Sequence, residues 1–278
     1  MSNVLVIGGA GFVGSNLCKK LIENGLNVYS LDNYSTGTEK NHCDGVVYKK
    51  GDAFHINEYS MPMDVNVVFH LGEYSRVEQS VKEPFVAING ICKTLVPVIE
   101  YCHRVNAKLI YSASSTRFGD AQSPYSISKA VNAILVKELC SYLGMSFAIT
   151  YFYNVYGNNE INEGKYATVV AKFLKAKKLG KPVTITKPGT QKRNFTHIDD
   201  IVNGLILVSD KGQGDGFGIG SDESYSILEL AEMIGLEWSI GDYAKGNRSE
   251  SKVVTTKTKE LGWKPVKSLI EYIGEQNV

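Results

Sequence analysis

The strongest constraint on the fold lies in the first fifteen residues, where a short apolar run leads directly into a glycine-rich loop. Residues 4–7 are followed by glycine at positions 8, 11 and 14, and helical spacing begins there. Such glycines allow a tight turn, a close backbone approach to a pyrophosphate, and close packing of helix on strand. Free N–H groups at the helix start favour a phosphate. A dinucleotide is therefore predicted to bind Gly8, Gly11, Phe12, Val13 and Gly14.

The first half of the chain alternates apolar runs with amphipathic stretches. The runs are not broken by polar residues, which is typical of strands buried on both faces of a parallel sheet. This order predicts an α/β fold, a Rossmann-type doubly wound parallel sheet. Strands are expected at residues 4–7, 28–31, 46–49, 67–70, 108–112 and 147–151, with helices at 14–24 and 85–105.

The rhythm changes after about residue 157, and a second, smaller region is expected there. Helices are predicted at 165–179 and 226–234, and short strands at 183–186 and 217–219. We expect residues 1–157 to form the dinucleotide-binding domain, completed by roughly 192–210. Residues 158–278 are expected to form mainly a smaller C-terminal substrate-binding α/β cap.

A carboxylate at the end of the second expected strand indicates which dinucleotide binds. Asp32 is followed by Asn33, and no arginine stands nearby. A carboxylate there can accept both ribose hydroxyls of adenosine and repels a 2′-phosphate, which favours NAD over NADP. Asp52 and Ala53 follow the third strand and can reach the adenine, although Gly-Asp is also an ordinary turn sequence.

A tyrosine and a lysine four residues apart suggest acid–base chemistry. Ser123 and Pro124 read as the N-cap and first residue of a helix, so Tyr125 and Lys129 share one face. A nearby ammonium stabilises a phenolate, which can take a hydroxyl proton while hydride leaves the carbon. The packing stripe of this helix is expected to be Ile127, Val131, Ile134, Leu135 and Leu139.

Motifs spread over nearly the whole chain resemble the extended short-chain dehydrogenase/reductase family, which includes nucleotide-sugar epimerases and dehydratases. They are the glycine loop, residues 31–33, 51–52 and 69–71, Ser80 with Pro84 and Asn89, Ser114 with Tyr125 and Lys129, and residues 154–157, 191–200, 219–221 and 261–265.

The resemblance implies a role for each matching residue. Ser114 would orient the sugar, Tyr125 would be the base, and Lys129 would hold the nicotinamide ribose and promote ionisation of the tyrosine. Leu71, Gly72 and Ser112 would also border NAD, and Asn89 would support the site. The substrate would contact Arg76, Ser114, Ser115, Thr116 and, at its diphosphate, Asn154, Arg193 and Arg248. The resemblance further implies a homodimer, paired through the helix of Tyr125 and the preceding long helix, and a role in polysaccharide biosynthesis.

The two residues after Ser114 favour one reaction over the others. Dehydratases of this kind carry Asp-Glu there, and decarboxylases carry Glu at the second position, whereas this chain has Ser115 and Thr116. Neither hydroxyl can act as a carboxylate acid or base near neutral pH. The predicted function is therefore an NAD-dependent nucleotide-sugar epimerase that inverts C4 of a UDP-hexose or UDP-N-acetylhexosamine through a 4-keto sugar. Alternatives are a keto-sugar reductase or dehydratase of the same fold and, in another class, a non-catalytic dinucleotide-binding regulator.

Glu73 departs from the usual pair of small residues after the fourth strand. We interpret it as a solvated loop charge and not as an extra acid or base, with Arg76 able to pair with it or with the substrate. His70 and His197 have no metal-ligand spacing, so structural roles and no metal are expected.

Charge and cysteine usage indicate which partners and compartment to expect. A net charge of +1 gives no reason to expect nucleic acid or an acidic membrane surface. No apolar run of membrane-spanning length is apparent. Five dispersed cysteines fit buried thiols in a reducing, cytoplasmic compartment.

Overall fold

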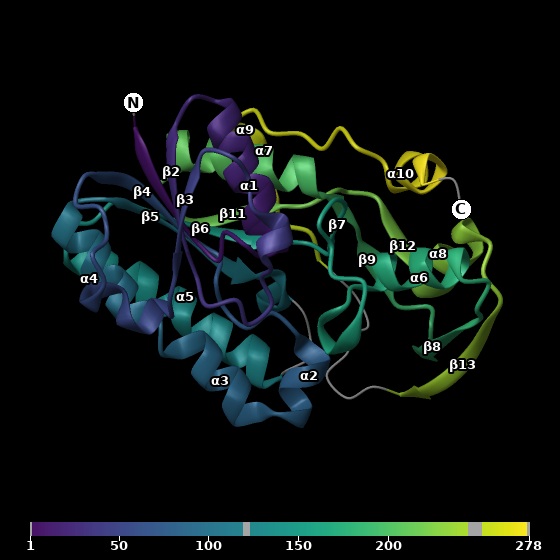
Figure 1. The fold of residues 1–278 in the computed structure, drawn as a ribbon. Coiled ribbons are helices and arrows are strands. Elements are labelled where there is room, and N and C mark those ends of the chain that lie inside the picture. The colour runs from purple at the N-terminus through teal and green to yellow at the C-terminus, as the bar shows by residue number, and fades with distance from the viewer. Residues whose placement is uncertain (1, 119–122, 244–251, 277–278) are drawn as a thin grey trace.

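The centre of the molecule is a seven-stranded sheet with the order β11-β6-β5-β4-β1-β2-β3, in which every neighbouring pair is parallel (Figure 1). The computed structural model describes residues 2–118, 123–243 and 252–276. The order reverses between β1 and β4, so the predicted doubly wound parallel sheet is confirmed. The strands are β1 (Asn3–Ile7), β2 (Asn27–Asp32), β3 (Val46–Lys50), β4 (Val65–His70), β5 (Lys108–Ser114), β6 (Phe147–Phe152) and β11 (Gly214–Ile219).

The seventh strand extends the dinucleotide-binding domain beyond the predicted boundary. The expected completing segment ends near residue 210, whereas β11 pairs with β6 and carries the sheet on to Ile219. Glycines at 214, 216 and 218 weaken the strand signal in this segment. The first six strands lie within two residues of their predicted bounds, because buried apolar runs define them.

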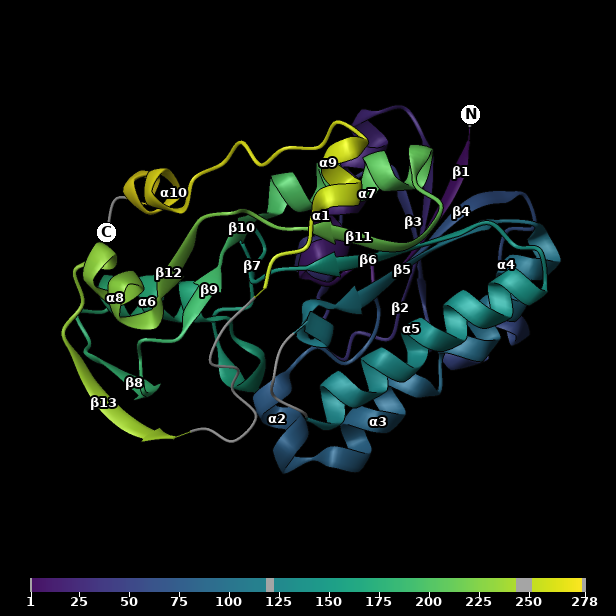
Figure 2. The ribbon, with the colours of Figure 1, turned by 180° about the vertical axis from the view of Figure 1, so that it is seen from behind.

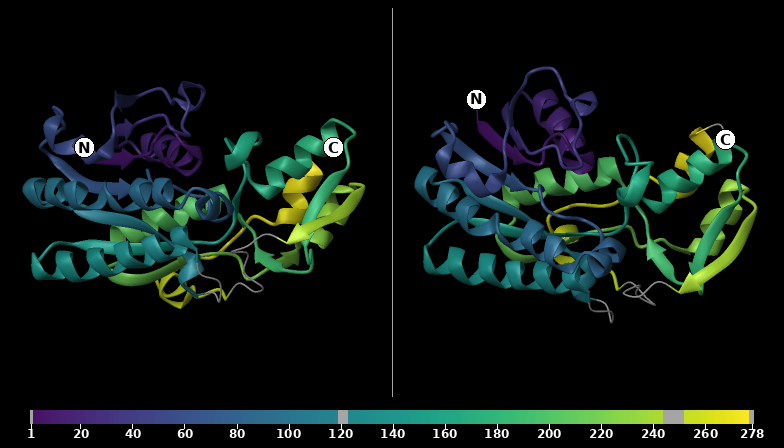
Figure 3. Two further views of the ribbon diagram at one scale, coloured as in Figure 1. Left: turned by 90° about the horizontal axis from the view of Figure 1, so that it is seen from below. Right: turned by 60° about the horizontal axis from the view of Figure 1, so that its bottom comes forward.

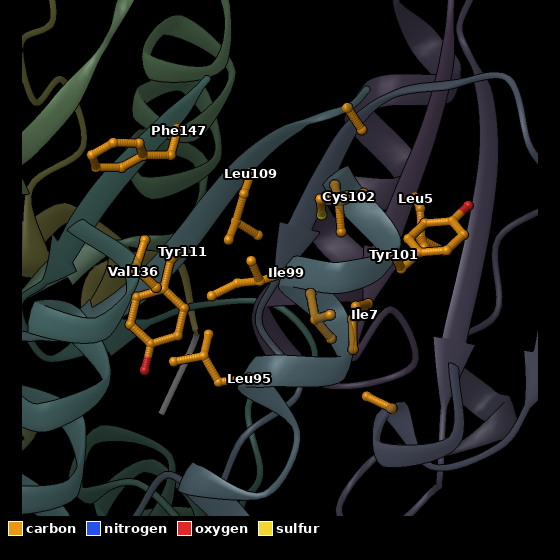
Figure 4. Close-up of a cluster of buried hydrophobic side chains, with 14 of the residues drawn as sticks. Leu5, Ile7, Leu95, Ile99, Tyr101, Cys102, Leu109, Tyr111, Val136 and Phe147 are labelled. Carbon is orange, nitrogen blue, oxygen red and sulfur yellow. The ribbon is translucent and has the colours of Figure 1, made fainter. Parts of the chain in front are cut away.

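Helices cover both faces of the sheet, as the lower views make clear (Figure 3). Val4 and Val6 of β1 join the core beneath α1 (Phe12–Glu23) and α7 (Ile198–Lys211). Leu5 and Ile7 join the opposite core, beneath α4 (Leu95–Val105) and α5 (Pro124–Tyr142) (Figure 4). Full burial of each such side chain contributes about 1.5–3 kcal/mol. This double burial explains the absence of polar alternation.

The long helix expected at residues 85–105 is two helices, α3 (Pro84–Cys92) and α4. Pro97 has no N–H to donate to the carbonyl of Lys93, and its ring disfavours an unbroken helix there. Contrary to expectation, Pro84–Val105 is long and apolar enough to cross a membrane by length and composition, the one such segment among the described residues. Its buried residues pack in the core beneath the sheet, and core helices of globular domains often meet the same criteria.

Helix α5 begins as predicted but presents a different face to the core. Ser123 caps it in a capping box with Ser126, and Pro124 is its first residue. Of the predicted packing stripe, Leu135 and Leu139 pack against the core, whereas Ile127, Val131 and Ile134 are 51%, 53% and 59% exposed and have no such contact. The buried face of α5 instead has mostly small and polar side chains, because it packs on α3 and around a buried polar cluster. The buried residues of α5 are Ser126, Ser128, Lys129, Asn132, Ala133, Val136 and Cys140.

The cap lies at one end of the sheet and has its own apolar core (Figure 2). Short strands pair there as β10–β7, β12–β9 and β13–β8. The elements outside the domain core are α2 (Val77–Lys82), β7 (Val155–Tyr156), α6 (Val169–Lys178), β8 (Val183–Lys187), β9 (Lys192–Asn194), β10 (Thr196–His197), β12 (Ser224–Ser226), α8 (Ile227–Ile234), β13 (Trp238–Tyr243), α9 (Thr256–Glu260) and α10 (Leu269–Glu275), with the 3₁₀ helices η1 (Glu39–Asn41), η3 (Ser115–Phe118) and η4 (Gly164–Tyr166). A fourth 3₁₀ element, η2 (Ala53–Glu58), contributes Ala53 and Ile56 to the domain core.

The C-terminal segment is fastened to the domain through Asp200 of α7. Its main-chain carbonyl accepts a hydrogen bond from Trp263 Nε1 at 2.9 Å. Its carboxylate accepts bonds from the main-chain N–H groups of Val266 and Lys267. These bonds explain why Trp263, far along the chain, lies in the core beneath α7.

Candidate functional site

A cavity of about 550 Å³ opens where the strand order reverses, at the carboxyl ends of the central strands. Ligands of open α/β sheets bind at such a switch point. The cavity brings together most of the predicted site residues. Among the described residues, its lining includes Gly8, Gly11, Phe12, Val13, Gly14, Asp32, Asn33, Asp52, Ala53, Leu71, Gly72, Arg76, Ser114, Ser115, Thr116, Tyr125 and Asn154.

The glycine loop has no room for side chains at two positions. A Cβ on Gly14 would lie 2.0 Å from the carbonyl oxygen of Gly8. Gly8 itself has a φ of +88°, and a Cβ there would lie 2.7 Å from Gly72 Cα. Gly11 caps α1 without a side-chain hydrogen bond. The first N–H groups of the helix are therefore available to a pyrophosphate, and the loop fits a dinucleotide.

Asp32 both shapes the loop and faces the cavity. Its carboxylate accepts hydrogen bonds from the N–H groups of Ala10 at 2.9 Å and Tyr34 at 2.8 Å. Its remaining lone pairs can accept ribose hydroxyls, as expected for an NAD site. Asp52 has fewer free lone pairs for the adenine than expected, because one of its carboxylate oxygens pairs with Lys93 at 2.8 Å. Burial acts to raise the pKa of Asp52, but Lys93 outweighs it and the net pKa lies below the usual value.

Ser114 and Tyr125 face the cavity from β5 and from the first turn of α5. Ser114 Oγ accepts hydrogen bonds from the N–H of Thr116 at 3.2 Å and its hydroxyl at 2.8 Å. The main-chain N–H of Tyr125 donates to Ser80 Oγ at 3.3 Å, and the N–H of Ser80 donates to the carbonyl of Arg76 at 3.1 Å. The Tyr125 hydroxyl has no hydrogen-bond partner among the described residues, so it is available to a substrate.

Lys129 is held behind the cavity wall by a buried carboxylate that sequence analysis misinterpreted. Its Nζ donates to Glu73 Oε2 at 2.5 Å and to the carbonyl oxygen of Ser112 at 2.7 Å. The two charged side chains are only 6% and 1% exposed. Of the three N–H groups of an ammonium, one is left for a ribose or a phenol. Because Lys129 has a counter-ion, the pair acts on Tyr125 less strongly than an isolated ammonium would.

Glu73 sits at the centre of a buried polar cluster, so its interpretation as a solvated loop charge is wrong. It accepts hydrogen bonds from Tyr111 Oη at 2.9 Å and Asn132 Nδ2 at 3.2 Å, and His70 Nε2 lies 3.3 Å away. Burial acts to raise the pKa of Glu73, but the charge of Lys129 and the contact with His70 outweigh it, so the net pKa lies below its usual value. One signal points to it in the sequence: the residue follows Gly72 at the end of a central strand.

Several predicted residues lie outside the cavity lining. Asn89 is exposed on α3 while its neighbour Gly90 lines the cavity, because one step along a helix turns the side chain by about 100°. Asn89 therefore does not border the cavity, and its supporting role stays a prediction. Ser112 lies behind the wall and donates to the carbonyl of His70 at 3.0 Å. Arg193 lies on β9, where its Nη1 donates to the carbonyl of Lys192. Arg248 lies outside the described residues.

The cap contributes two groups to the same region. Asn154 has a φ of +32° and donates through Nδ2 to the carbonyl of Asn194 at 3.0 Å. Glu160, which sequence analysis did not single out, accepts hydrogen bonds from the Thr168 hydroxyl and the Gly157 N–H. Burial is the main cause that raises the pKa of Glu160 to about 7.

Arg76 connects the domain to the cap across the cavity. Its Nε donates to the carbonyl of Tyr166 at 2.7 Å, Nη2 donates to the same oxygen, and Nη1 donates to the carbonyl of Ser75. Burial lowers the pKa of Arg76, an effect that Tyr125 and Glu160 partly oppose. The structure pairs Glu73 with Lys129 and not with Arg76.

Comparisons with known proteins agree with this geometry. The sequence model of a family described as the NAD dependent epimerase/dehydratase family matches residues 4–220. A putative UDP-glucose 4-epimerase of Methanocaldococcus jannaschii is 28% identical over 97% of this chain and 95% of its own length. UDP-glucuronic acid decarboxylase 3 of Arabidopsis thaliana is 27% identical over 96% and 86%. The crystal structure of UDP-glucose 4-epimerase from Thermotoga maritima with UDP-glucose has a TM-score of 0.90 and 28% identity, covering 98% of this chain and 96% of that one.

Proposed function

Since the chain belongs to the NAD-dependent epimerase/dehydratase family, we propose that it is a 4-epimerase that inverts C4 of a UDP-linked hexose or N-acetylhexosamine. Membership makes it an NAD-dependent enzyme of nucleotide-sugar chemistry. Relatives named as epimerases and as decarboxylases are similarly distant in sequence, so residues of the site must carry the choice of reaction.

The cofactor site is formed by the glycine loop and Asp32, and Lys129, held behind the cavity wall, keeps one N–H for the ribose. NAD supplies a reversible hydride acceptor next to the sugar. The chain then has two tasks at the reacting carbon: to remove and return a hydroxyl proton, and to hold the sugar. Tyr125, with its free hydroxyl, suits the first task, and the Ser114 hydroxyl suits the second.

The observation that carries the proposal is the chemistry of the residues after Ser114. Ser115 and Thr116 both line the cavity, and neither can protonate a leaving hydroxyl or act as a carboxylate base. Glu73 does not replace such a group, because four donors surround its carboxylate and keep it ionised. A site with a phenol base, and with no free acid beside Ser114 in the part of the chain that the structure describes, supports oxidation and hydride return without elimination.

Proton NMR of the purified protein, without added NAD, tests this function. Incubated separately with UDP-glucose, UDP-galactose and their N-acetyl forms, it should produce a new anomeric signal. Both members of one pair should converge on the same mixture, and a Tyr125→Phe variant should show no signal. Net consumption of added NADH would instead indicate a reductase. Loss of water from the sugar, or loss of CO₂ when UDP-glucuronic acid is the substrate, would refute the roles given to Ser115 and Thr116.

We also propose that the enzyme is a homodimer. Apolar side chains on neighbouring helices α3 and α5 are exposed, and a large exposed apolar patch is typical of a protein interface. The residues are Phe85, Val86, Ile127, Val131 and Ile134. Five dispersed thiols without disulfides support our proposal of a reducing, cytoplasmic compartment.

A further inference from the structure

Among the residues that the structure describes, not every charged side chain that lines the cavity has a partner of opposite charge. Lys93 is paired with Asp52 at 2.8 Å, and Glu73 is paired with Lys129 behind the wall. Asp32 has no cation as a partner among the described residues, but it accepts two main-chain bonds at the end expected to hold the ribose. At the opposite end, Arg76 is a cation without a carboxylate within 4.0 Å in the described part of the chain.

Arg76 also has hydrogen-bonding capacity to spare. A guanidinium has five N–H groups, and main-chain carbonyls of Ser75 and Tyr166 take three of them. The remaining two have no partner among the described residues. Burial of a guanidinium is unfavourable, and the carboxyl that partly offsets it, Glu160, carries less charge than usual near neutral pH because burial raises its pKa to about 7. An anion at this point would remove that cost through two parallel charge-assisted bonds.

The place of Arg76 shows which part of a nucleotide-sugar carries the anion. Arg76 and Tyr125 line the same cavity, and Tyr125 acts electrostatically on the Arg76 charge. Ser80 joins their backbones through two hydrogen bonds. Tyr125 must meet a sugar hydroxyl, so a group that meets Arg76 lies on the sugar or next to it.

We propose that Arg76 binds a carboxylate carried by the sugar of the substrate, so that the enzyme prefers acidic nucleotide-sugars to neutral hexoses. The inference rests on the proposed function only in that the cavity binds a nucleotide-sugar. The carboxylate stands either at C6, as in a uronic acid, or on an ether-linked side chain of the ring. Both present the same planar pair of oxygens to the guanidinium.

Calorimetric titration of the NAD-containing protein tests the proposal, with UDP-glucose, UDP-glucuronic acid, UDP-N-acetylmuramic acid and UDP as ligands. An acidic sugar should bind roughly 10- to 100-fold more tightly than UDP-glucose. Whichever acid shows the preference identifies the position of the carboxylate. The preference should vanish in Arg76→Gln and survive in part in Arg76→Lys, while UDP affinity is unchanged. Arg104→Gln, an exposed arginine outside the cavity, is the matched control.

A role for Arg76 that is only structural predicts a different pattern. Arg76 would then only hold Tyr166 against the domain, and Arg76→Gln would weaken the binding of acidic and neutral nucleotide-sugars by the same factor. That result overturns the proposal. Equal affinity of the wild-type protein for acidic and neutral nucleotide-sugars also overturns it, and that measurement does not depend on whether a variant folds. If the protein prefers acidic nucleotide-sugars but does not invert C4 of any of them, the proposed epimerase activity is refuted and the carboxylate site at Arg76 is retained.

Discussion

Replacing Glu73 by glutamine tests whether the buried pair with Lys129 holds the site together. The variant keeps the size of the side chain but leaves the Lys129 ammonium without a counter-ion at 6% exposure. Removing one partner of a buried pair costs about 3–5 kcal/mol. For a chain of this size that corresponds to a fall in Tm of roughly 6–20 °C. Urea unfolding at pH 7.5, followed by circular dichroism, measures the loss.

The matched control is Glu78→Gln in helix α2. Glu78 pairs with Lys82 at 3.0 Å, but both side chains are more than 60% exposed. Removing an exposed pair changes stability by less than about 1 kcal/mol. Equal losses for Glu73→Gln and Glu78→Gln would refute the reasoning. Adding Lys129→Met to Glu73→Gln should cost about 1–3 kcal/mol less than the two single effects together, because the stranded charge is gone.

The same pair has a defined pH dependence. The folded-state pKa of Glu73 lies below its ordinary value of 4.5. Its contribution to stability is therefore fully present above the unfolded-state pKa and is lost as the pH falls through the folded-state pKa. The difference between the wild-type protein and Glu73→Gln should shrink at acidic pH. A difference that stays constant down to the acid transition would contradict the assignment.

Three further outcomes are expected. Burial raises the pKa of Glu160 to about 7, so stability attributable to this group falls as pH rises from 4.5 to 7. The free energy of unfolding of Glu160→Gln, measured in urea, should exceed that of the wild-type protein by about 2–3 kcal/mol at pH 8 and equal it near pH 4. The same difference at both pH values would contradict the raised pKa of Glu160. Tyr125→Phe should lower kcat by about 10²–10⁴ in the NMR assay, with unchanged Tm and NAD content, unless the phenol is not the base. Ile134→Asp should give monomers in light scattering, whereas Val266→Asp on the cap should not, and a monomeric wild-type protein would exclude the dimer.

The cofactor half of the site could be predicted because its signals are local. A side chain at Gly14 would meet the backbone of Gly8 and Gly9, Gly8 has a left-handed φ of its own, and Asp32 bonds to the main chain of Ala10 in the loop and of Tyr34. The first turn of α5 could be predicted in the same way, because the N-cap Ser123 and the first helical residue Pro124 directly precede Tyr125. In each case the spacing along the chain already determines the geometry.

The substrate half could not be predicted to the same depth because distant segments create it. Glu73 is buried only because Tyr111 of β5 and Lys129 and Asn132 of α5 surround it. The same contacts turn the polar face of α5 inward and leave Ile134 exposed, which reverses the prediction made from periodicity alone. An apolar stripe marks a face that will be covered, but not what covers it.

Ser80 has a consequence for how the enzyme can acquire new substrates. It is fully buried and links the carbonyl of Arg76 to the N–H of Tyr125. The backbone that carries the guanidinium is thus tied to the first turn of α5, which carries the phenol, through one buried serine. A substitution at residue 76 can therefore change the side chain offered to the sugar while the main-chain link to Tyr125 is kept. Exchanging that single side chain is the shortest route to altering sugar selectivity while keeping the chemistry.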